Sequence, residues 1–150
     1  MALYILMKHL CEDYNLPPPK KQERYRLTID RDIAVFLIQE AGQVDFVISA
    51  ALGPVSENSQ AAIFQKLLEA NHQEIVTQRC VLSFDPARNQ VVLSRWVTEA
   101  TIHYKDFLQM IKDFVEHVKR WSAEIKQDFA GGSKPAAEAE PQRGGFSIKV

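Results

Sequence analysis

The chain has 150 residues and a formal net charge of -1 at pH 7, which suits one globular domain with a sizeable core. A nearly neutral chain has no overall field for holding phosphate, and its basic residues gather only near residues 20–26, so a nucleic-acid partner is not expected. The apolar run at residues 2–7 is too short to span a membrane and carries no export signal. We therefore expect a cytoplasmic location and no membrane insertion.

Residues 2–14 show the spacing of an amphipathic helix, because apolar side chains recur every three or four positions. Pro17-Pro18-Pro19 should end this helix, since proline lacks the amide hydrogen that continues the helical ladder. We interpret the three prolines as an extended connection. A Pro-rich recognition motif is the alternative.

Three strands are expected next, over residues 25–29, 33–38 and 44–52, where apolar and polar positions alternate between short polar breaks. Short connections join antiparallel strands, whereas parallel strands need long crossovers. We therefore predict an antiparallel arrangement of the three strands.

The register of these strands depends on the turn at Ala41-Gly42. A two-residue turn there places Leu37 opposite Phe46, and one apolar face then forms the core. The opposite face is also apolar, although a one-sided antiparallel sheet normally shows polar groups to water. The apolar residues expected on this outer face are Phe36, Ile38 and Val47. A register shifted by one residue would exchange the two faces and is the alternative.

A helix is expected over residues 56–71, between the two groups of strands. Its apolar surface is wider than one core contact needs, because Ile63 and Ala70 lie beside the stripe of Phe64 and Leu67 rather than on it. We interpret the surplus as part of a dimer interface. A helix buried deeply in its own domain is the alternative.

A second hairpin is expected from residues 75–84 and 90–97, because Asp85-Pro86-Ala87-Arg88-Asn89 between them is rich in turn residues. A five-residue loop would place Leu82 and Trp96 on the core face. The opposite face would then be apolar as well, and it should meet something other than its own core.

The predicted dimer interface combines this opposite face of the hairpin with the surplus face of the central helix. In the five-residue-loop register Arg79 lies directly across from Arg95, which is unfavourable without an acidic group or solvent between them. The residues expected at the interface are Ile63, Ala70, Val81, Leu93, Arg79 and Arg95.

Residues 101–129 form the longest periodic segment and predict a long amphipathic helix. Residues 131–150 lack periodicity and hold few apolar groups, so we expect one domain over residues 1–130 followed by a flexible tail. The end of the tail, residues 146–150, has strand character. Docking of this segment is the alternative to an inert terminus.

No motif for catalysis, cofactor binding or metal binding is present. The four histidines lack metal-ligand spacing, and no glycine-rich phosphate loop or nucleophile elbow occurs. Cys11 and Cys80 suit free buried thiols rather than a disulfide framework. Cys80 acting with a histidine and an acid is the one nucleophilic arrangement to consider, and we expect a protein without enzymatic activity.

The order of elements, together with four local stretches, resembles the class I type III secretion chaperones of the Tir chaperone (CesT-like) family. The stretches are the helix start Leu3–Leu10, the strand end Ala51–Pro54, the helix Phe64–Asn71 and the hairpin Leu82–Arg95. The resemblance implies an α+β fold of a helix, three antiparallel strands, a helix, a β-hairpin and a long C-terminal helix. It also implies a homodimer.

The resemblance further implies a bacterial cytoplasmic chaperone that binds the N-terminal region of secreted effector proteins in extended form and hydrolyses no ATP itself. The ATPase of the secretion machinery is a second candidate partner. We expect the effector on the apolar outer face of the first sheet, with the edge strand as a place for a further strand to pair. The expected effector-binding residues are Phe36, Ile38, Val47, Tyr25 and Leu27. A dimeric adaptor unrelated to secretion is the alternative function.

Overall fold

The structure, a computed structural model, describes residues 2–73, 79–98, 102–129 and 146–150. Its elements are α1 (Leu3–Asp13), β1 (Arg24–Ile29), β2 (Ile33–Ile38), β3 (Phe46–Pro54), α2 (Gln60–His72), β4 (Val81–Asp85), β5 (Gln90–Val97), α4 (Tyr104–Phe129) and β6 (Ile148–Lys149). A short 3-10 helix, Glu57–Ser59, leads into α2. The predicted α+β fold and its order of elements are confirmed, and β6 is an additional strand.

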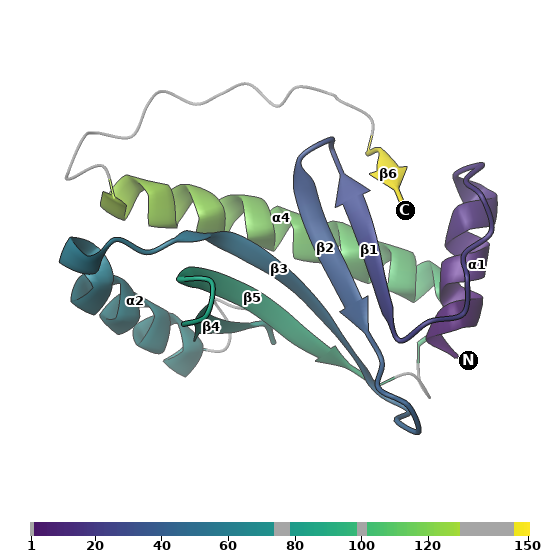
Figure 1. The fold of residues 1–150 in the computed structure, drawn as a ribbon, viewed down its shortest axis with the longest axis horizontal. Helices are drawn as coiled ribbons and strands as arrows, with labels where there is room; N and C mark the ends of the chain where they lie inside the picture. Colours follow the sequence, from purple (N-terminus) through teal and green to yellow (C-terminus); the bar gives the residue numbers. More distant parts are fainter. Residues whose placement is uncertain (1, 74–78, 99–101, 130–145) are drawn as a thin grey trace.

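The strands form a single antiparallel sheet with the order β4-β5-β3-β2-β1-β6. β3 joins the two groups of strands, because it pairs with β2 on one side and with β5 on the other. Figure 1 shows α4 lying along one face of the sheet, with α1 beside β1 and α2 toward the β4 end. We call the face toward α4 the inner face and the opposite one the outer face.

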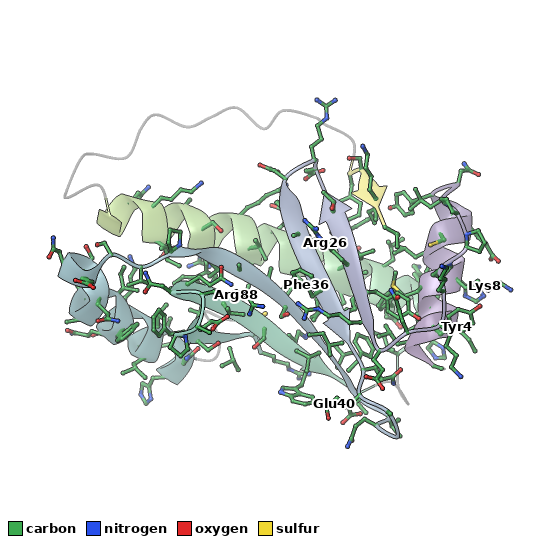
Figure 2. All side chains as sticks on the ribbon, in the orientation of Figure 1. Tyr4, Lys8, Arg26, Phe36, Glu40 and Arg88 are labelled. Atoms are coloured by element: carbon green, nitrogen blue, oxygen red, sulfur yellow. The ribbon has the colours of Figure 1, made fainter. Side chains whose placement is uncertain are left out.

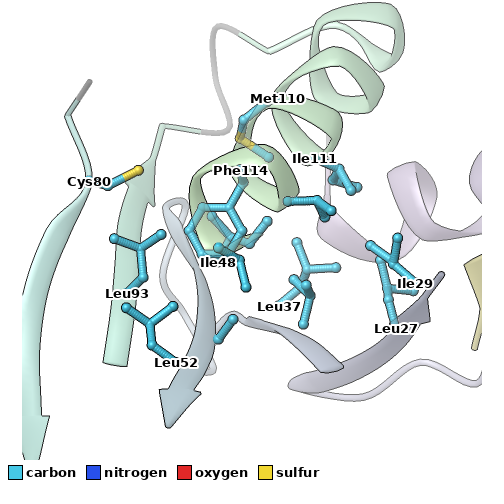
Figure 3. Close-up of a cluster of buried hydrophobic side chains, with 14 of the residues drawn as sticks. Leu27, Ile29, Leu37, Ile48, Leu52, Cys80, Leu93, Met110, Ile111 and Phe114 are labelled. Atoms are coloured by element: carbon cyan, nitrogen blue, oxygen red, sulfur yellow. The ribbon is translucent and has the colours of Figure 1, made fainter. Parts of the chain in front are cut away.

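α4 holds the sheet through a continuous apolar seam. The buried residues of this seam are Phe107, Met110, Ile111, Phe114, Val115, Val118, Trp121 and Ile125. The ring of Phe107 meets the ring of Phe46 edge-on, with centroids 6.0 Å apart. Figure 3 shows Phe114 pointing toward Ile48, and the same cluster continues toward β1. Full burial of one such side chain contributes about 1.5–3 kcal/mol, so α4 and the sheet stabilise each other.

The register of β2 against β3 differs from the prediction by two residues. Leu37 pairs with Ile48 rather than with Phe46. The turn does lie at Ala41 and Gly42, where Gly42 has φ of +80°, but the connection is wider because the side-chain amide of Gln39 donates to two loop carbonyls. A shift of two residues keeps every side chain on its predicted face, because strand side chains alternate with a period of two.

The register of β4 against β5 differs from the prediction by one residue, which exchanges the faces of β5. Leu82 pairs with Leu93, and Asp85 pairs with Gln90, so the loop has four residues rather than five. The Asp85 carboxylate causes this, because its Oδ1 accepts the backbone N–H groups of Ala87 and Arg88 at 3.0 and 3.3 Å. Leu93 is therefore fully buried, whereas Trp96 is 72% exposed.

The face that α2 turns to the core also differs from the prediction. Its buried residues are Ile63, Leu67 and Ala70, whereas Leu68 is 70% exposed. A helix with apolar residues on several sides has no single preferred stripe, so its contact with the sheet selects the buried one. Ile63 and Ala70 belong to the core of the chain itself.

Asn71 at the end of α2 covers the free edge of β4. Its side chain donates to the carbonyl of Leu82 at 2.8 Å and accepts the N–H of Leu82 at 2.9 Å. These two bonds replace the pairing that a further strand would give. Unpaired strand edges invite association with other chains, so this contact protects one end of the sheet.

Replacing Asn71 with alanine should therefore lower the thermal midpoint. The substitution leaves a partly buried N–H and C=O of Leu82 without partners, which costs about 1–3 kcal/mol. For a domain of this size, each kcal/mol shifts the midpoint by roughly 2–4 °C. Thermal unfolding followed by circular dichroism measures the shift, and Asn58→Ala, at an exposed asparagine ahead of α2, is the matched control. Equal midpoints for the two variants would contradict this role of Asn71.

Residues 146–150 lie against the sheet, which corrects the prediction that the whole of residues 131–150 is a flexible tail. Within this segment β6 pairs with the end of β1, matching Thr28 with Lys149 and Ile29 with Ile148. Ile148 is only 5% exposed. The remainder of the predicted tail lies outside the described residues.

Candidate binding surface

A row of apolar side chains crosses the outer face of the sheet. Ile38 of β2 pairs with Val47 of β3, and Val47 pairs in turn with Trp96 of β5. Ile38 and Val47 are half-buried, and Trp96 is largely exposed. We call these three residues the outer-face row. They lie on the outer face of the sheet, opposite the face that packs on the apolar seam of α4.

Phe36 extends this surface toward β1. It lies two residues before Ile38 on the same face, and the guanidinium of Arg24 lies 4.3 Å from the centre of its ring. Such a contact suits an aromatic side chain that is only half-buried. Figure 2 shows Phe36 near the middle of the sheet, with Arg26 of β1 on one side of it.

A cavity of about 650 Å³ opens next to Phe36. It forms because β2 and β3 pair only over residues 36–38 and 47–49, so the strands separate toward the β1–β2 turn and leave α4 as the floor. Its lining is mixed, and the apolar part comes from Ile33, Ala34, Phe36, Ala51, Val118 and Ala123. A cavity with an apolar part beside the outer-face row can receive side chains of a bound molecule.

Charged groups form one rim of this cavity. The ammonium of Lys119 lies 2.9 Å from Oδ2 of Asp30, which joins α4 to the turn after β1. This hydrogen bond lowers the pKa of Asp30 and raises the pKa of Lys119. Both groups are therefore charged at neutral pH, and they hold the turn in place.

The structure separates the predicted effector-binding residues into two groups. Phe36, Ile38 and Val47 lie on the outer face, as predicted. Tyr25 and Leu27 were expected to take part through the edge strand to which they belong. Their side chains are fully buried in the core, so only their backbone groups on β1 can meet a partner, and their part in effector binding stays a prediction. Trp96 was missed, because the five-residue loop assigned to the second hairpin turned it inward. The acceptor side chain of Asp85 was the signal for the shorter loop.

The predicted interface residues also divide. Three of them, Ile63, Ala70 and Leu93, are buried within the chain, so the prediction that they lie outside its core is wrong. Val81 is 49% exposed on the outer face, Arg79 is exposed and precedes β4, and Arg95 is half-buried. Because β4 begins after Arg79 and the register is shifted, the two arginines are not paired across the hairpin.

A second apolar surface lies where α2 meets β4. Its main residues are Phe64, Leu68 and Phe84, which we call the α2–β4 surface. The rings of Phe64 and Phe84 have centroids 4.9 Å apart, and Leu68 beside them is 70% exposed. The surface is indented by a shallow cavity of about 260 Å³. An exposed apolar patch of this kind typically marks an interaction site.

The thiols are not arranged for nucleophilic chemistry. Cys11 and Cys80 are both buried, and burial raises the pKa of each thiol. An activated cysteine has a lowered pKa and some exposure. Among the described residues no group of three His, Cys, Asp or Glu side chains could hold a metal ion. Within the same residues, none of the helices has the length and apolar character needed to cross a membrane.

The model of the Tir chaperone protein (CesT) family matches residues 6–122. This match covers most of the chain, and the protein belongs to that family.

Solved structures show the same fold. A chain of the ExsC–ExsE complex has a TM-score of 0.71 at 19% identity, covering 83% of this chain and 97% of that one. A chain of the HopA1–SchA chaperone–effector complex has a TM-score of 0.65 at 13% identity, covering 79% and 91%. A chain of the Yersinia pestis type III secretion chaperone SycH in complex with a stable fragment of YscM2 has a TM-score of 0.61 at 14% identity, covering 80% and 99%. No protein with a curated description matches the chain.

Proposed function

We propose that this protein is a bacterial type III secretion chaperone, which binds the N-terminal segment of a secreted effector in the cytoplasm and keeps it soluble. Membership of the Tir chaperone family supports the class of function. The observation that carries the site is the outer-face row, where apolar side chains remain uncovered in the isolated chain. Such a surface lowers the solubility of a free domain unless a ligand covers it for part of the time.

The shape of this surface suits an extended peptide. Ile38, Val47 and Trp96 stand on neighbouring strands, which are about 4.8 Å apart, so the row is long and narrow. An extended peptide crossing the strands can lay alternate side chains on the row and into the cavity beside Phe36. Binding of this kind depends on the spacing of apolar residues in the peptide rather than on one defined sequence. The chaperone then needs no folded effector and no cofactor.

The proposal includes a homodimer built on the α2–β4 surface. Leu68 is exposed, Phe64 and Phe84 are half-buried, and all three lie at the β4 end of the sheet. A two-fold axis through this end would bury each copy's Leu68 against the partner. The outer-face rows of the two copies would remain free, so one effector segment could contact both copies. Exposed Val81, on the outer face of the same edge strand, is the predicted interface residue that this arrangement retains.

Co-purification tests the effector site. The chain is co-expressed with candidate secreted proteins, and Phe36→Asp with Val47→Asp is expected to abolish their retention while leaving the chain folded. A second variant, Trp96→Asp, changes a side chain that is 72% exposed and therefore avoids any effect on the core. Both variants place carboxylates where the effector's apolar side chains would have to desolvate them.

The matched control is Val44→Asp, an equally drastic change at a 58% exposed residue in the loop between β2 and β3. This variant should retain the effector. Retention by Phe36→Asp with Val47→Asp and by Trp96→Asp would place the site elsewhere. If the wild type retains no secreted protein, the alternative of an adaptor unrelated to secretion is favoured.

A further inference from the structure

The two edges of the sheet are covered in different ways. The β4 edge is covered by one side chain of a neighbouring helix, Asn71. The β1 edge is covered by backbone, because the last residues of the same chain pair with it as β6. Figure 1 shows β6 beside the end of β1, between β1 and α1. A backbone strand at an edge is the arrangement by which a separate extended peptide would bind there.

The side chains of residues 146–150, which we call the docked segment, are also arranged as in a bound extended peptide. Ile148 is 5% exposed, and Phe146 two residues earlier packs on the core with its ring 6.4 Å from that of Tyr14 at the end of α1. The ammonium of Lys112 on α4 lies 5.6 Å from the same ring. Ser147 and Lys149 are exposed. Alternate residues therefore enter the space between α1 and α4, while the others face solvent.

Asp30 connects this segment to the rim of the cavity. Its N–H donates to the carbonyl of Ser147 at 3.1 Å, and its Oδ1 accepts the N–H of Ser147 at 3.4 Å. Its other carboxylate oxygen is held by Lys119. Lys119 of α4 therefore holds the Asp30 carboxylate that accepts from Ser147.

The pairing is short compared with the edge that is available. β1 has six residues, and β6 pairs with two of them, Thr28 and Ile29. Along Arg24–Leu27 the described part of the chain supplies no further strand on this side. A longer strand could therefore form the two pairs that β6 makes and further pairs along β1. The docked segment is one that a longer peptide can displace.

We propose that residues 146–150 occupy the end of the β1 edge in place of the effector, until a strand of the effector displaces them. The inference rests on the proposed function. It assigns the end of the β1 edge as a second part of the effector-binding site. The sequence pattern that fits there is an aromatic residue followed two positions later by a branched aliphatic residue. Phe146 and Ile148 show this pattern within the chain itself.

The first test uses the full-length chain and a synthetic peptide of residues 146–150. In the variant Phe146→Ser with Ile148→Ser the internal segment loses both apolar anchors, and the free peptide should bind and shift the amide resonances of Thr28, Ile29 and Asp30. In the wild type the internal segment competes, so the apparent dissociation constant should be about 3–10-fold higher. The matched control Lys149→Ser changes an exposed residue and should behave as the wild type. Equal peptide binding to wild type and double variant, or no binding to either, would overturn the inference.

The second test uses the effector recovered by co-purification. The double variant should bind it about 3–10-fold more tightly than the wild type and Lys149→Ser. In the wild type, effector binding should move the resonances of Phe146 to those of a free segment. An effector that binds while Phe146 stays docked would overturn the inference and leave the proposed function intact. If no secreted protein binds any variant, the proposed function fails, whereas the peptide test still decides whether the β1 edge accepts a strand.

Discussion

Leu93→Glu is expected to abolish folding, whereas Trp96→Glu, three residues along the same strand, is expected to leave the chain folded. Leu93 is fully buried, and its strand partners Leu82 and Ala50 are buried as well. A carboxylate there would be desolvated without a partner, which costs several kcal/mol. The whole stability of a domain is about 5–15 kcal/mol, so one such change is sufficient. Trp96 is 72% exposed, and a charge at that position stays in water.

Circular dichroism and soluble expression measure this pair of variants. The two substitutions introduce the same side chain on the same strand, so strand propensity contributes nearly equally to both. The pair also tests the register of the hairpin, because a five-residue loop would bury Trp96 and expose Leu93. A folded Leu93→Glu protein with an unfolded Trp96→Glu protein would overturn the register given by the Asp85 turn.

Leu68→Glu is expected to convert a dimer to a folded monomer. Leu68 is 70% exposed in the single chain, so the glutamate costs the monomer little. In the proposed interface the same carboxylate would be buried against its copy and against the Phe64–Phe84 pair. An unpaired buried charge weakens association by about 3 kcal/mol or more, equivalent to about a 100-fold higher dissociation constant.

Sedimentation at micromolar concentration measures the change, with Trp96→Glu as the matched control. Trp96 is an exposed apolar residue on a different surface, so this variant should remain dimeric while losing the effector. Leu68→Glu should show the opposite loss. A monomeric wild type would contradict the proposed dimer, and a dimeric Leu68→Glu protein would place the interface elsewhere.

The sequence by itself determined the long helix α4 and the faces of β2 and β3. The seam from Phe107 to Ile125 repeats at helical spacing over the whole element, so no tertiary contact was needed to recognise it. Phe36, Ile38 and Val47 were placed on the outer face despite a register wrong by two residues. Strand side chains alternate with a period of two, so a register error of two residues leaves each side chain on the same face. The family resemblance relied on the same robust features, the order and type of the elements.

Only the tertiary structure decided the faces of β5 and α2 and the position of residues 146–150. One carboxylate, that of Asp85, shortens the loop by a residue and exchanges Leu93 with Trp96. α2 is apolar on several sides, so the sheet selects Ile63 and Ala70 for burial and leaves Leu68 exposed. The five residues at the chain end alternate apolar and polar side chains, but this pattern is too short to show which strand they pair with. Their partner, the end of β1, is more than 100 residues away in sequence. A local sequence pattern does not predict a contact between residues so far apart in the chain.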